Sequence, residues 1–325
     1  MKHPPPKGVS VPADKDEARV LTYAVYGLLL LVIMISTYLH HYQPQVLSVP
    51  SNMNLAAWQA PAFEQTTIHD RMTVQERQQV QRAGIPMAKS TADLVVNELI
   101  MILLGWWCFR HARKHYGFWM ASCFFIGSFV FTGLEESAWI LTGRFLGGTV
   151  SLPPGGTIYG TYWFTKGILW FVETPVNACL GWFVYAYSCV WIAGRVLPKM
   201  SLLTRATVGG LIAMGIDLWQ DPVQTSPELV NWVWGKGDFL LFFGIPFYNF
   251  VGWFLLIFLF AIFWERLPEI AEKWGQRRAM AIFLSVSTVS SVIVAGLIFV
   301  IWFVVMGTLL SLMGLGHGLQ IPPGW

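Results

Sequence analysis

Residues Val20–Leu39 read VLTYAVYGLLLLVIMISTYL, a run of 20 residues without a charged side chain. A helix needs about 20 apolar residues to cross the hydrocarbon core of a bilayer, so this stretch predicts a transmembrane helix. A charged segment, residues 15–19, precedes it, and no small-residue cleavage site follows closely. We therefore interpret the stretch as a membrane anchor rather than as a signal peptide.

The composition of the whole chain of 325 residues agrees with a membrane protein. Apolar residues make up 55% of the chain and charged residues only 12%, whereas charged residues account for roughly 25% of a typical soluble domain. A chain so poor in charge cannot cover the surface of a soluble globule of this size. The composition therefore excludes a cytosolic enzyme, a disordered scaffold and a protein that binds nucleic acid.

Six further apolar stretches predict six more transmembrane helices. They cover about Leu94–Phe109, Phe118–Leu141, Ile168–Ala193, Ala206–Trp219, Phe239–Trp264 and Ala279–Gly316. The last stretch is longer than one span requires, so we expect its C-terminal part to lie along the membrane interface or to form a short extra element. The sequence thus predicts an all-α polytopic membrane helix bundle of about seven transmembrane helices. We expect a single integral membrane domain, 1–325, in a prokaryotic cytoplasmic membrane.

Basic residues indicate the orientation of this bundle. The connections after the second, fourth and sixth spans, at 110–116, 195–205 and 266–278, are short and rich in Lys and Arg. Short loops with an excess of Lys and Arg face the cytoplasm. The N-terminal tail, 1–19, is then cytoplasmic, and the long connection 40–93 lies on the outer side. On the same outer side, Gly147–Gly156 (GGTVSLPPGG) predicts a turn-rich loop.

No sequence pattern indicates a metal or cofactor site. The four cysteines fall inside predicted spans, and none forms a C-x-x-C pair. His111 and His115 are four residues apart, but they lie in a basic connection, where a role in membrane orientation is the better explanation. The chain contains no dinucleotide fingerprint, no G-x-S-x-G and no H-E-x-x-H. We therefore expect neither a metal nor a redox cofactor.

Ionisable side chains inside the predicted spans gather in one layer near the outer face. Such residues are expensive in a membrane, and each is a functional-site hypothesis. With the orientation above, the carboxyl and amide groups at this depth are Asn97, Glu98, Glu135, Glu136, Glu173, Asn177, Asp217, Asp221 and Asn249. Six carboxyl groups at one depth predict a shared cavity. Its members include Glu173 with Asn177 and Asp217 with Asp221, pairs four residues apart that we expect to share a helix face.

Carboxyl groups so close together suggest acid–base chemistry. Two of them cannot both ionise at low cost in a cavity of low dielectric, so one is expected to stay protonated near neutrality and to serve as a general acid. Simpler interpretations remain open for several acids. Glu98 is explained equally as a structural partner of Asn97 or of a neighbouring helix, and Glu135 and Asp221 as solvated helix ends.

Aromatic residues near the acids are expected to line an elongated apolar pocket, although packing alone explains each one. They are Tyr162, Trp170, Trp219, Trp232, Trp234, Tyr248 and Trp253.

Short motifs follow one another through Leu134–Trp264. In chain order they are Glu136–Gly143 (ESAWILTG), Tyr159–Phe164 (YGTYWF), Glu173-Thr174-Pro175, Leu180-Gly181-Trp182, Asp217–Pro222 (DLWQDP), Trp232-Val233-Trp234 and Gly244–Trp253 (GIPFYNFVGW). This order resembles the carotenoid biosynthesis membrane proteins that include the carotenoid 1,2-hydratases and bisanhydrobacterioruberin hydratase. The W-x-W pair and the last motif are the most specific. The resemblance covers the central core, 134–264.

The resemblance implies an enzyme that adds water to the terminal double bond of an acyclic carotenoid end group, without redox cofactor or metal. On this hypothesis Asp217 donates the proton and Asp221 adjusts the pKa of Asp217. Glu136 or Glu173 positions the water. The residues expected to bind or orient the substrate are Glu98, Tyr162, Asn177, Trp219, Trp232, Trp234, Tyr248, Asn249 and Trp253. Besides the carotenoid or a related isoprenoid, membrane lipids are the expected partners.

Two other functions remain open at this point. The D-x-x-x-D formed by Asp217 and Asp221 is compatible with a membrane prenyltransferase, whose substrate diphosphate binds magnesium through such aspartates. Membrane carboxylates also relay protons, which is compatible with a proton-coupled transporter or a lipid-binding subunit. The particular carotenoid, the number of its ends that react and the oligomeric state are not determined by the sequence.

Overall fold

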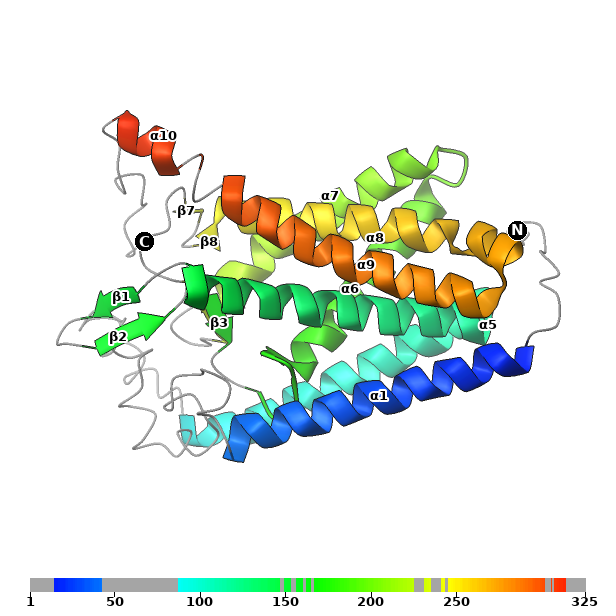
Figure 1. The fold of residues 1–325 in the computed structure, drawn as a ribbon, viewed down its shortest axis with the longest axis horizontal. Helices are drawn as coiled ribbons and strands as arrows, with labels where there is room; N and C mark the ends of the chain where they lie inside the picture. The colour runs from blue at the N-terminus through cyan, green and yellow to red at the C-terminus, as the bar shows by residue number, and fades with distance from the viewer. Residues whose placement is uncertain are drawn as a thin grey trace.

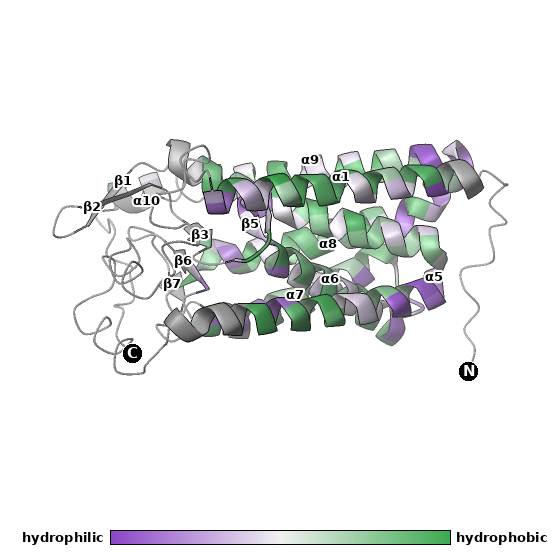
Figure 2. Cartoon of the chain, turned by 90° about the horizontal axis from the view of Figure 1, so that it is seen from below, coloured by the Kyte–Doolittle hydropathy of each residue, from purple (hydrophilic) through white to green (hydrophobic). Residues whose placement is uncertain are grey.

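The apolar stretches form long helices in the computed structural model of the protein. The structure describes residues 15–42, 87–146, 149–152, 156–159, 162–164, 167–224, 231–234, 241–242, 245–301, 305 and 307–313. Its helices are α1 (Lys15–Tyr42), α5 (Met87–Leu146), α6 (Val176–Val196), α7 (Leu202–Gln224), α8 (Phe247–Trp274), α9 (Gln276–Phe299) and α10 (Gly307–Leu312). Within this part of the chain, six helices are long and apolar enough to cross a membrane. They run side by side (Figure 1), and hydrophobic residues dominate their middle sections (Figure 2).

Helix α5 contains two of the predicted spans because it folds back on itself at Gly117. Gly117 has φ 83° and ψ 167°, a conformation that only glycine adopts readily. The rings of Phe109 and Phe125, on either side of this kink, lie 6.0 Å apart between centroids, and the cyan and green halves of α5 run in opposite directions in Figure 1. Each of the seven predicted stretches therefore has a helical counterpart, which confirms the all-α polytopic bundle. The predicted connection 110–116 is itself helical, since Gly117 alone makes the turn.

The described strands form four two-stranded antiparallel ribbons. They pair β1 (Thr149–Leu152) with β2 (Gly156–Tyr159), β3 (Tyr162–Phe164) with β6 (Trp232–Trp234), β4 (Trp170–Phe171) with β5 (Thr174–Pro175), and β7 (Leu241–Phe242) with β8 (Ile245–Pro246). The predicted outer loop Gly147–Gly156 thus contributes to a β-ribbon. The short helix α10, which follows α9 after a gap in the described residues, confirms the extra element expected in the last apolar stretch.

The predicted fourth span is wrong at its N-terminal end. The segment Ile168–Pro175 is an extended hairpin, and α6 begins only at Val176. Pro175 lacks a backbone N–H and is the extended residue that precedes the helix, with φ −62° and ψ 141°. Glu173 therefore lies in the hairpin turn, and the expectation that it shares a helix face with Asn177 is incorrect. The sixth span likewise starts later than predicted, at Phe247.

The end of α1 holds this hairpin in place through side chains. Ser36 Oγ accepts a hydrogen bond from the N–H of Val172 (2.9 Å), and Thr37 Oγ1 accepts one from the N–H of Trp170 (2.9 Å). The Nε2 atoms of His40 and His41 donate to the carbonyls of Val172 and Ile168, both at 2.7 Å. Backbone groups outside regular structure must find such partners at membrane depth, because lipid offers none. The two histidines at the end of α1 therefore anchor a non-helical segment.

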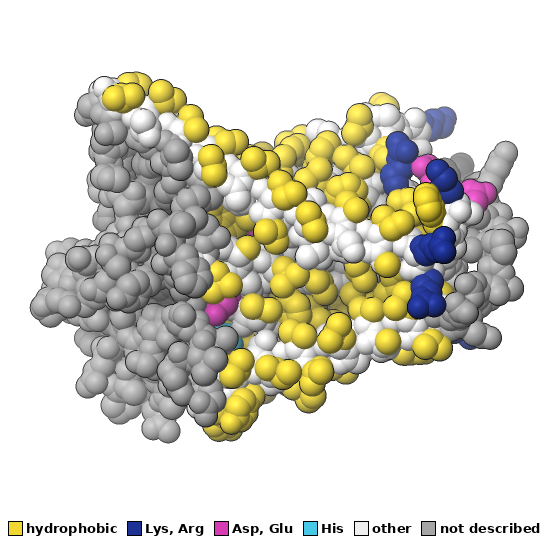
Figure 3. Space-filling view, viewed as in Figure 1, with side chains coloured by type: hydrophobic (Ala, Val, Ile, Leu, Met, Phe, Trp, Pro, Cys, Tyr) yellow, Lys and Arg dark blue, Asp and Glu magenta, His cyan; other side chains and the backbone are white. Residues whose placement is uncertain are grey.

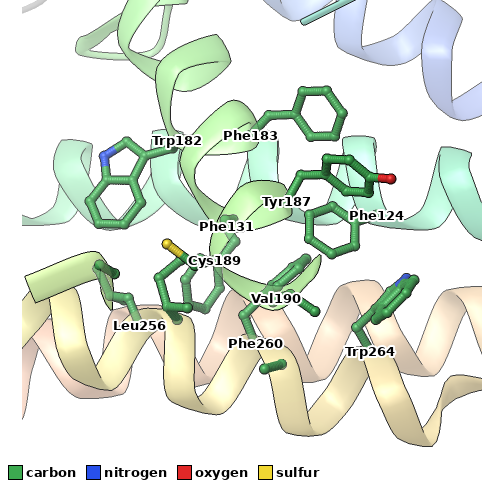
Figure 4. Packing of buried hydrophobic residues seen from close by; sticks show 14 of the residues in the cluster. Phe124, Phe131, Trp182, Phe183, Tyr187, Cys189, Val190, Leu256, Phe260 and Trp264 are labelled. Atoms are coloured by element: carbon green, nitrogen blue, oxygen red, sulfur yellow. The ribbon is translucent and has the colours of Figure 1, made fainter. Parts of the chain in front are cut away.

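Aromatic side chains fill the centre of the bundle (Figure 4). The ring of Phe124 on α5 packs edge-to-face against Phe260 and Trp264 on α8, with centroids 4.9 and 5.0 Å apart. Phe183 and Tyr187 of α6 contact the same ring at 6.0 and 5.6 Å. Pairs of this geometry contribute about 0.5–1.5 kcal/mol each beyond their buried area. This core joins α5, α6 and α8 into one unit.

Lys and Arg side chains gather at one end of the helices, beyond a wide hydrophobic zone (Figure 3). This is the end where α1 and α9 begin (Figure 1), and it corresponds to the side predicted as cytoplasmic. There, Arg205 of α7 forms an ion pair with Glu265 of α8. Most of the predicted tail, 1–19, and of the predicted outer connection, 40–93, lies outside the described residues.

Helices α7 and α8 approach closely at Gly210. A Cβ atom at this position would lie 2.7 Å from the carbonyl oxygen of Phe254 and 2.8 Å from its ring. The backbone oxygen cannot move away without a shift of α8, so only glycine allows this spacing. By contrast, a Cβ atom at Gly215 of the same helix would meet nothing within 4 Å.

We predict that Gly210→Ala destabilises the protein, because the added methyl group forces α7 and α8 apart. Thermal unfolding in detergent should show a midpoint several degrees lower, a shift typical of overpacking that costs about 1–3 kcal/mol. The matched variant Gly215→Ala should unfold at or slightly above the temperature of the unmodified protein, because alanine favours helix over glycine. Equal midpoints for the two variants would contradict the close approach.

Candidate active site

Two buried carboxyl groups of α7 share one amide of α8. Asn249 Nδ2 donates a hydrogen bond to Asp217 Oδ2 at 2.8 Å and another to Asp221 Oδ2 at 2.7 Å. Asp217 is 0% exposed and Asp221 is 2% exposed. The two aspartates also interact directly with each other. A single amide thus holds two acids in close proximity inside the bundle.

The local sequence explains why both acids point the same way. Asp217, Gln220, Asp221 and Gln224 follow the i, i+3, i+4, i+7 spacing that places side chains on one face of a helix. Asn249 lies in the first turn of α8, directly after the β7–β8 ribbon. The close approach of α7 and α8 at Gly210 brings this turn to the polar face of α7. The sequence prediction that Asp217 and Asp221 share a helix face is consistent with this arrangement.

A cavity of about 110 Å³ opens beside Asp221. Its described lining comes from α5, α6, α7 and α8 together with the ribbons β3–β6 and β4–β5. The polar lining residues are Asn97, Glu136, Asn177, Gln220, Asp221, Gln224, Asn231 and Asn249, and the others are Met101, Phe164, Pro175, Ala178, Gly181, Trp182, Tyr185, Trp232 and Trp253. The cavity therefore combines two carboxyl groups and six carboxamides with an aromatic wall.

Glu136 of α5 contributes the second acid of the cavity. Its Oε1 accepts a hydrogen bond from the indole N–H of Trp182 on α6, at 3.3 Å. An N–H donor of this kind favours the ionised form of a carboxyl group. Asp217 Oδ1, in contrast, is buried without a hydrogen-bond partner among the described residues, and an unsolvated oxygen disfavours ionisation. The two acids thus differ in their hydrogen bonding: Glu136 Oε1 has an indole N–H donor, and Asp217 Oδ1 has no partner among the described residues.

Aromatic rings form the apolar wall of the cavity. The rings of Trp182 and Trp253 stack with centroids 4.0 Å apart, and Tyr185 lies 5.9 Å from Trp253. On another side, β3 pairs with β6 in a register that sets Phe164 opposite Trp232, and their rings lie 5.8 Å apart. The ring faces of tryptophan and tyrosine attract cations. An apolar ligand with a positive charge at one carbon would be well accommodated here.

Six residues predicted for the site line the cavity. They are Glu136, Asn177, Asp221, Trp232, Asn249 and Trp253. Asp217 lies behind Asp221 and does not line it, although it is linked to the cavity through Asn249. For the predicted Tyr162 and Trp234 the structure gives paired strand positions, while their side chains lie outside what it describes.

The structure does not bring four other predicted residues to the cavity. Glu173 is buried in the hairpin turn, where its N–H binds Ser137 Oγ. Glu98 is buried, and neither of its carboxyl oxygens has a hydrogen-bond partner among the described residues. Tyr248 is buried and stacks on Trp139 at 5.2 Å. Trp219 is 72% exposed on the outside of α7.

Several cavity residues were missed by the sequence interpretation. Gln220 and Gln224 belong to the polar face of α7, and their spacing to Asp217 and Asp221 would have identified them. On α6, Trp182 and Tyr185 lie on the same helix face as Asn177, Ala178 and Gly181. Their spacing to the predicted Asn177 would have indicated them. Nothing in the local sequence identifies Asn231 or Phe164, because strand pairing of distant segments brings them to the cavity.

These features define an integral membrane protein with an acid-containing cavity that has an aromatic wall. A family model described as carotenoid biosynthesis protein matches residues 97–316. This match covers more than half of the chain, from the first half of α5 to just beyond α10, so the chain belongs to this family. The protein therefore has a role in carotenoid biosynthesis and an isoprenoid or carotenoid substrate. No curated protein and no solved structure matches the chain.

Proposed function

We propose that the protein is a carotenoid hydratase, which adds water to the terminal C=C bond of an acyclic carotenoid end group. The observation that carries the proposal is the pairing of Asp221 and Glu136 in one cavity beside the stacked rings of Trp182 and Trp253. Hydration of such an alkene needs a proton donor, a surface that tolerates a carbocation and a base for the incoming water. The cavity contains a candidate for each.

Asp221 is our candidate for the proton donor, with Asp217 behind it. This exchanges the roles expected from the sequence, since Asp221 lines the cavity and Asp217 does not. The two carboxyl groups share the amide of Asn249 and repel each other when both are ionised, so the pair retains one proton. The proton passes from Asp221 to one alkene carbon, the π electrons form the new C–H bond, and the positive charge remains on the tertiary carbon.

Water then completes the addition. Its oxygen bonds to the tertiary carbon, and it loses a proton to the carboxylate of Glu136. Return of this proton to the aspartate pair through the polar lining restores the enzyme, so the net change is one water added to one double bond. The rings of Trp182, Trp253 and Tyr185 stabilise the cation through their faces. The cavity accommodates the end group, and the rest of the isoprenoid chain extends toward the lipid.

The alternatives fit the described lining less well. A prenyl diphosphate carries several negative charges and requires cationic neighbours, whereas the lining residues that the structure describes include two acids and no Lys or Arg. The aspartates of the D-x-x-x-D are engaged by Asn249.

Proton-coupled transport remains an alternative hypothesis, and substrate-driven proton flux in vesicles would support it. For either function, we propose a prokaryotic cytoplasmic membrane as the location of the protein.

Expression in a bacterial host that makes lycopene tests the proposed reaction. We predict that mass analysis of the pigments shows a gain of one or two water molecules per carotenoid. An added isoprene unit would instead support prenyl transfer. Unchanged pigments, with the protein present in the membrane, would contradict hydration of this substrate.

We predict that Asp221→Asn abolishes hydration, because an amide cannot donate the required proton. Removal of a general acid lowers rates by about 10²–10⁴-fold. Asp217→Asn should lower the rate less, since Asp217 acts on Asp221 and does not line the cavity. Turnover in isolated membranes, normalised to inserted protein, provides the comparison. A normal rate for Asp221→Asn would refute its role as donor.

Trp182→Phe separates the hydrogen bond that Trp182 donates from the stacking of its ring. Phenylalanine keeps an aromatic face against Trp253 but removes the N–H that binds Glu136. We predict a slower reaction, by about tenfold for the loss of one hydrogen bond to a charged group, with little change in KM. Trp182→Leu, which removes the ring as well, should be slower still. Equal rates for the two variants would indicate that the ring face contributes nothing.

A further inference from the structure

Gln220 presents a buried hydrogen-bond acceptor that the protein does not use. Its side chain lines the cavity, and its Oε1 has no partner among the described residues. A buried polar atom without a partner destabilises the protein, because it has lost its hydrogen bonds to water. Such an atom in a cavity wall indicates that a ligand or a water supplies the missing hydrogen bond. Because the atom is a carbonyl oxygen, the ligand must offer an O–H or N–H donor.

The neighbouring glutamine of the same helix face makes a useful contrast. Gln224 also lines the cavity, but its Oε1 accepts a hydrogen bond from Asn231 Nδ2, and its backbone carbonyl accepts one from the N–H of Asn231 at 2.8 Å. Asn249 uses its amide group to bind both aspartates. Gln220 therefore differs from Gln224 in having a buried acceptor left over for a ligand.

The position of Gln220 suits the water of the proposed reaction. It precedes Asp221 in α7, and both side chains line the same cavity as Glu136. A hydrocarbon end group carries no O–H or N–H, so it cannot satisfy Gln220. Water can donate one hydrogen to Gln220 and another to the carboxylate of Glu136, which leaves an oxygen lone pair for the carbocation.

We propose that Gln220 binds the water molecule that attacks the carbocation, an inference that rests on the proposed hydration. The same carboxamide then accepts a hydrogen bond from the hydroxyl group of the product, because the water oxygen becomes the product oxygen. Gln220 thereby determines whether the cation forms an alcohol or an alkene. With water held in place, the C–O bond forms. Without it, the cation returns a proton from an adjacent carbon to the nearby carboxylate, and an alkene is regenerated.

Reaction in D₂O measures this partition directly. The donor acid exchanges its proton with solvent, so each protonation of the alkene places deuterium on carbon. Capture by water gives alcohol with deuterium on carbon. Loss of a proton from a neighbouring methyl group gives alkene that retains deuterium, whereas loss of the deuteron just added returns unlabelled alkene and is not counted. The ratio of deuterated alcohol to deuterated recovered alkene, measured by mass spectrometry on isolated membranes fed with lycopene, therefore compares capture of the cation between variants.

Gln220→Met keeps the length of the side chain and removes the acceptor. We expect it to lower the alcohol-to-alkene ratio by about tenfold, the effect of one lost hydrogen bond. Gln224→Met is the matched control on the same helix face: whatever its overall rate, its ratio should stay within about twofold of the unmodified protein. Gln220→Glu retains acceptor oxygens and should recover part of the alcohol.

The outcomes separate this inference from the proposed function. If the unmodified protein forms no deuterated alcohol, the proposed hydration of lycopene fails. If it forms the alcohol and Gln220→Met gives the same ratio, the role of Gln220 fails while hydration stands. Should Gln220→Met not insert into the membrane, Gln220→Leu provides the same comparison, and an unchanged ratio there overturns the inference equally.

Discussion

The site depends on one amide that donates to two acids. Burial of carboxyl groups in a bundle of low dielectric is costly, and Asn249 offsets part of this cost by satisfying Asp217 Oδ2 and Asp221 Oδ2 together. That contact joins α7 and α8, which also approach each other closely at Gly210. Helix packing and site chemistry are thus coupled, and a change that separates the two helices also separates the acids from their common donor.

Non-helical segments complete a cavity that helices alone would not close. Pro175 and Phe164 reach the cavity from short ribbons, and such segments need partners for their backbone groups inside a membrane. Helix α1 supplies them to the β4–β5 hairpin from Ser36 and His40, among others. It lies outside the matched family region, 97–316, and yet supports one wall of the cavity.

The cavity combines polar and apolar lining residues, and the proposed reaction of an oily substrate with water requires both. The rings of Trp182, Trp253 and Trp232 provide an apolar surface for an isoprenoid end, while six carboxamides provide neutral hydrogen-bonding groups. Neutral amides offer hydrogen bonds without introducing a further charge that would compete with the acids. In the proposed hydration, the acids act on the alkene and the water beside these rings.

The sequence by itself determined the membrane bundle, because hydropathy is a local property. Helical spacing is local as well, and it placed Asp217 and Asp221 on one face of α7. Tertiary structure decided which acids meet: Glu173 lies in a hairpin because Pro175 and the partners on α1 override an apolar, helix-like stretch. It also decided that Trp219 faces outward and that Phe164 faces Trp232. Such contacts join segments distant along the chain, and periodicity within a single segment carries no information about them.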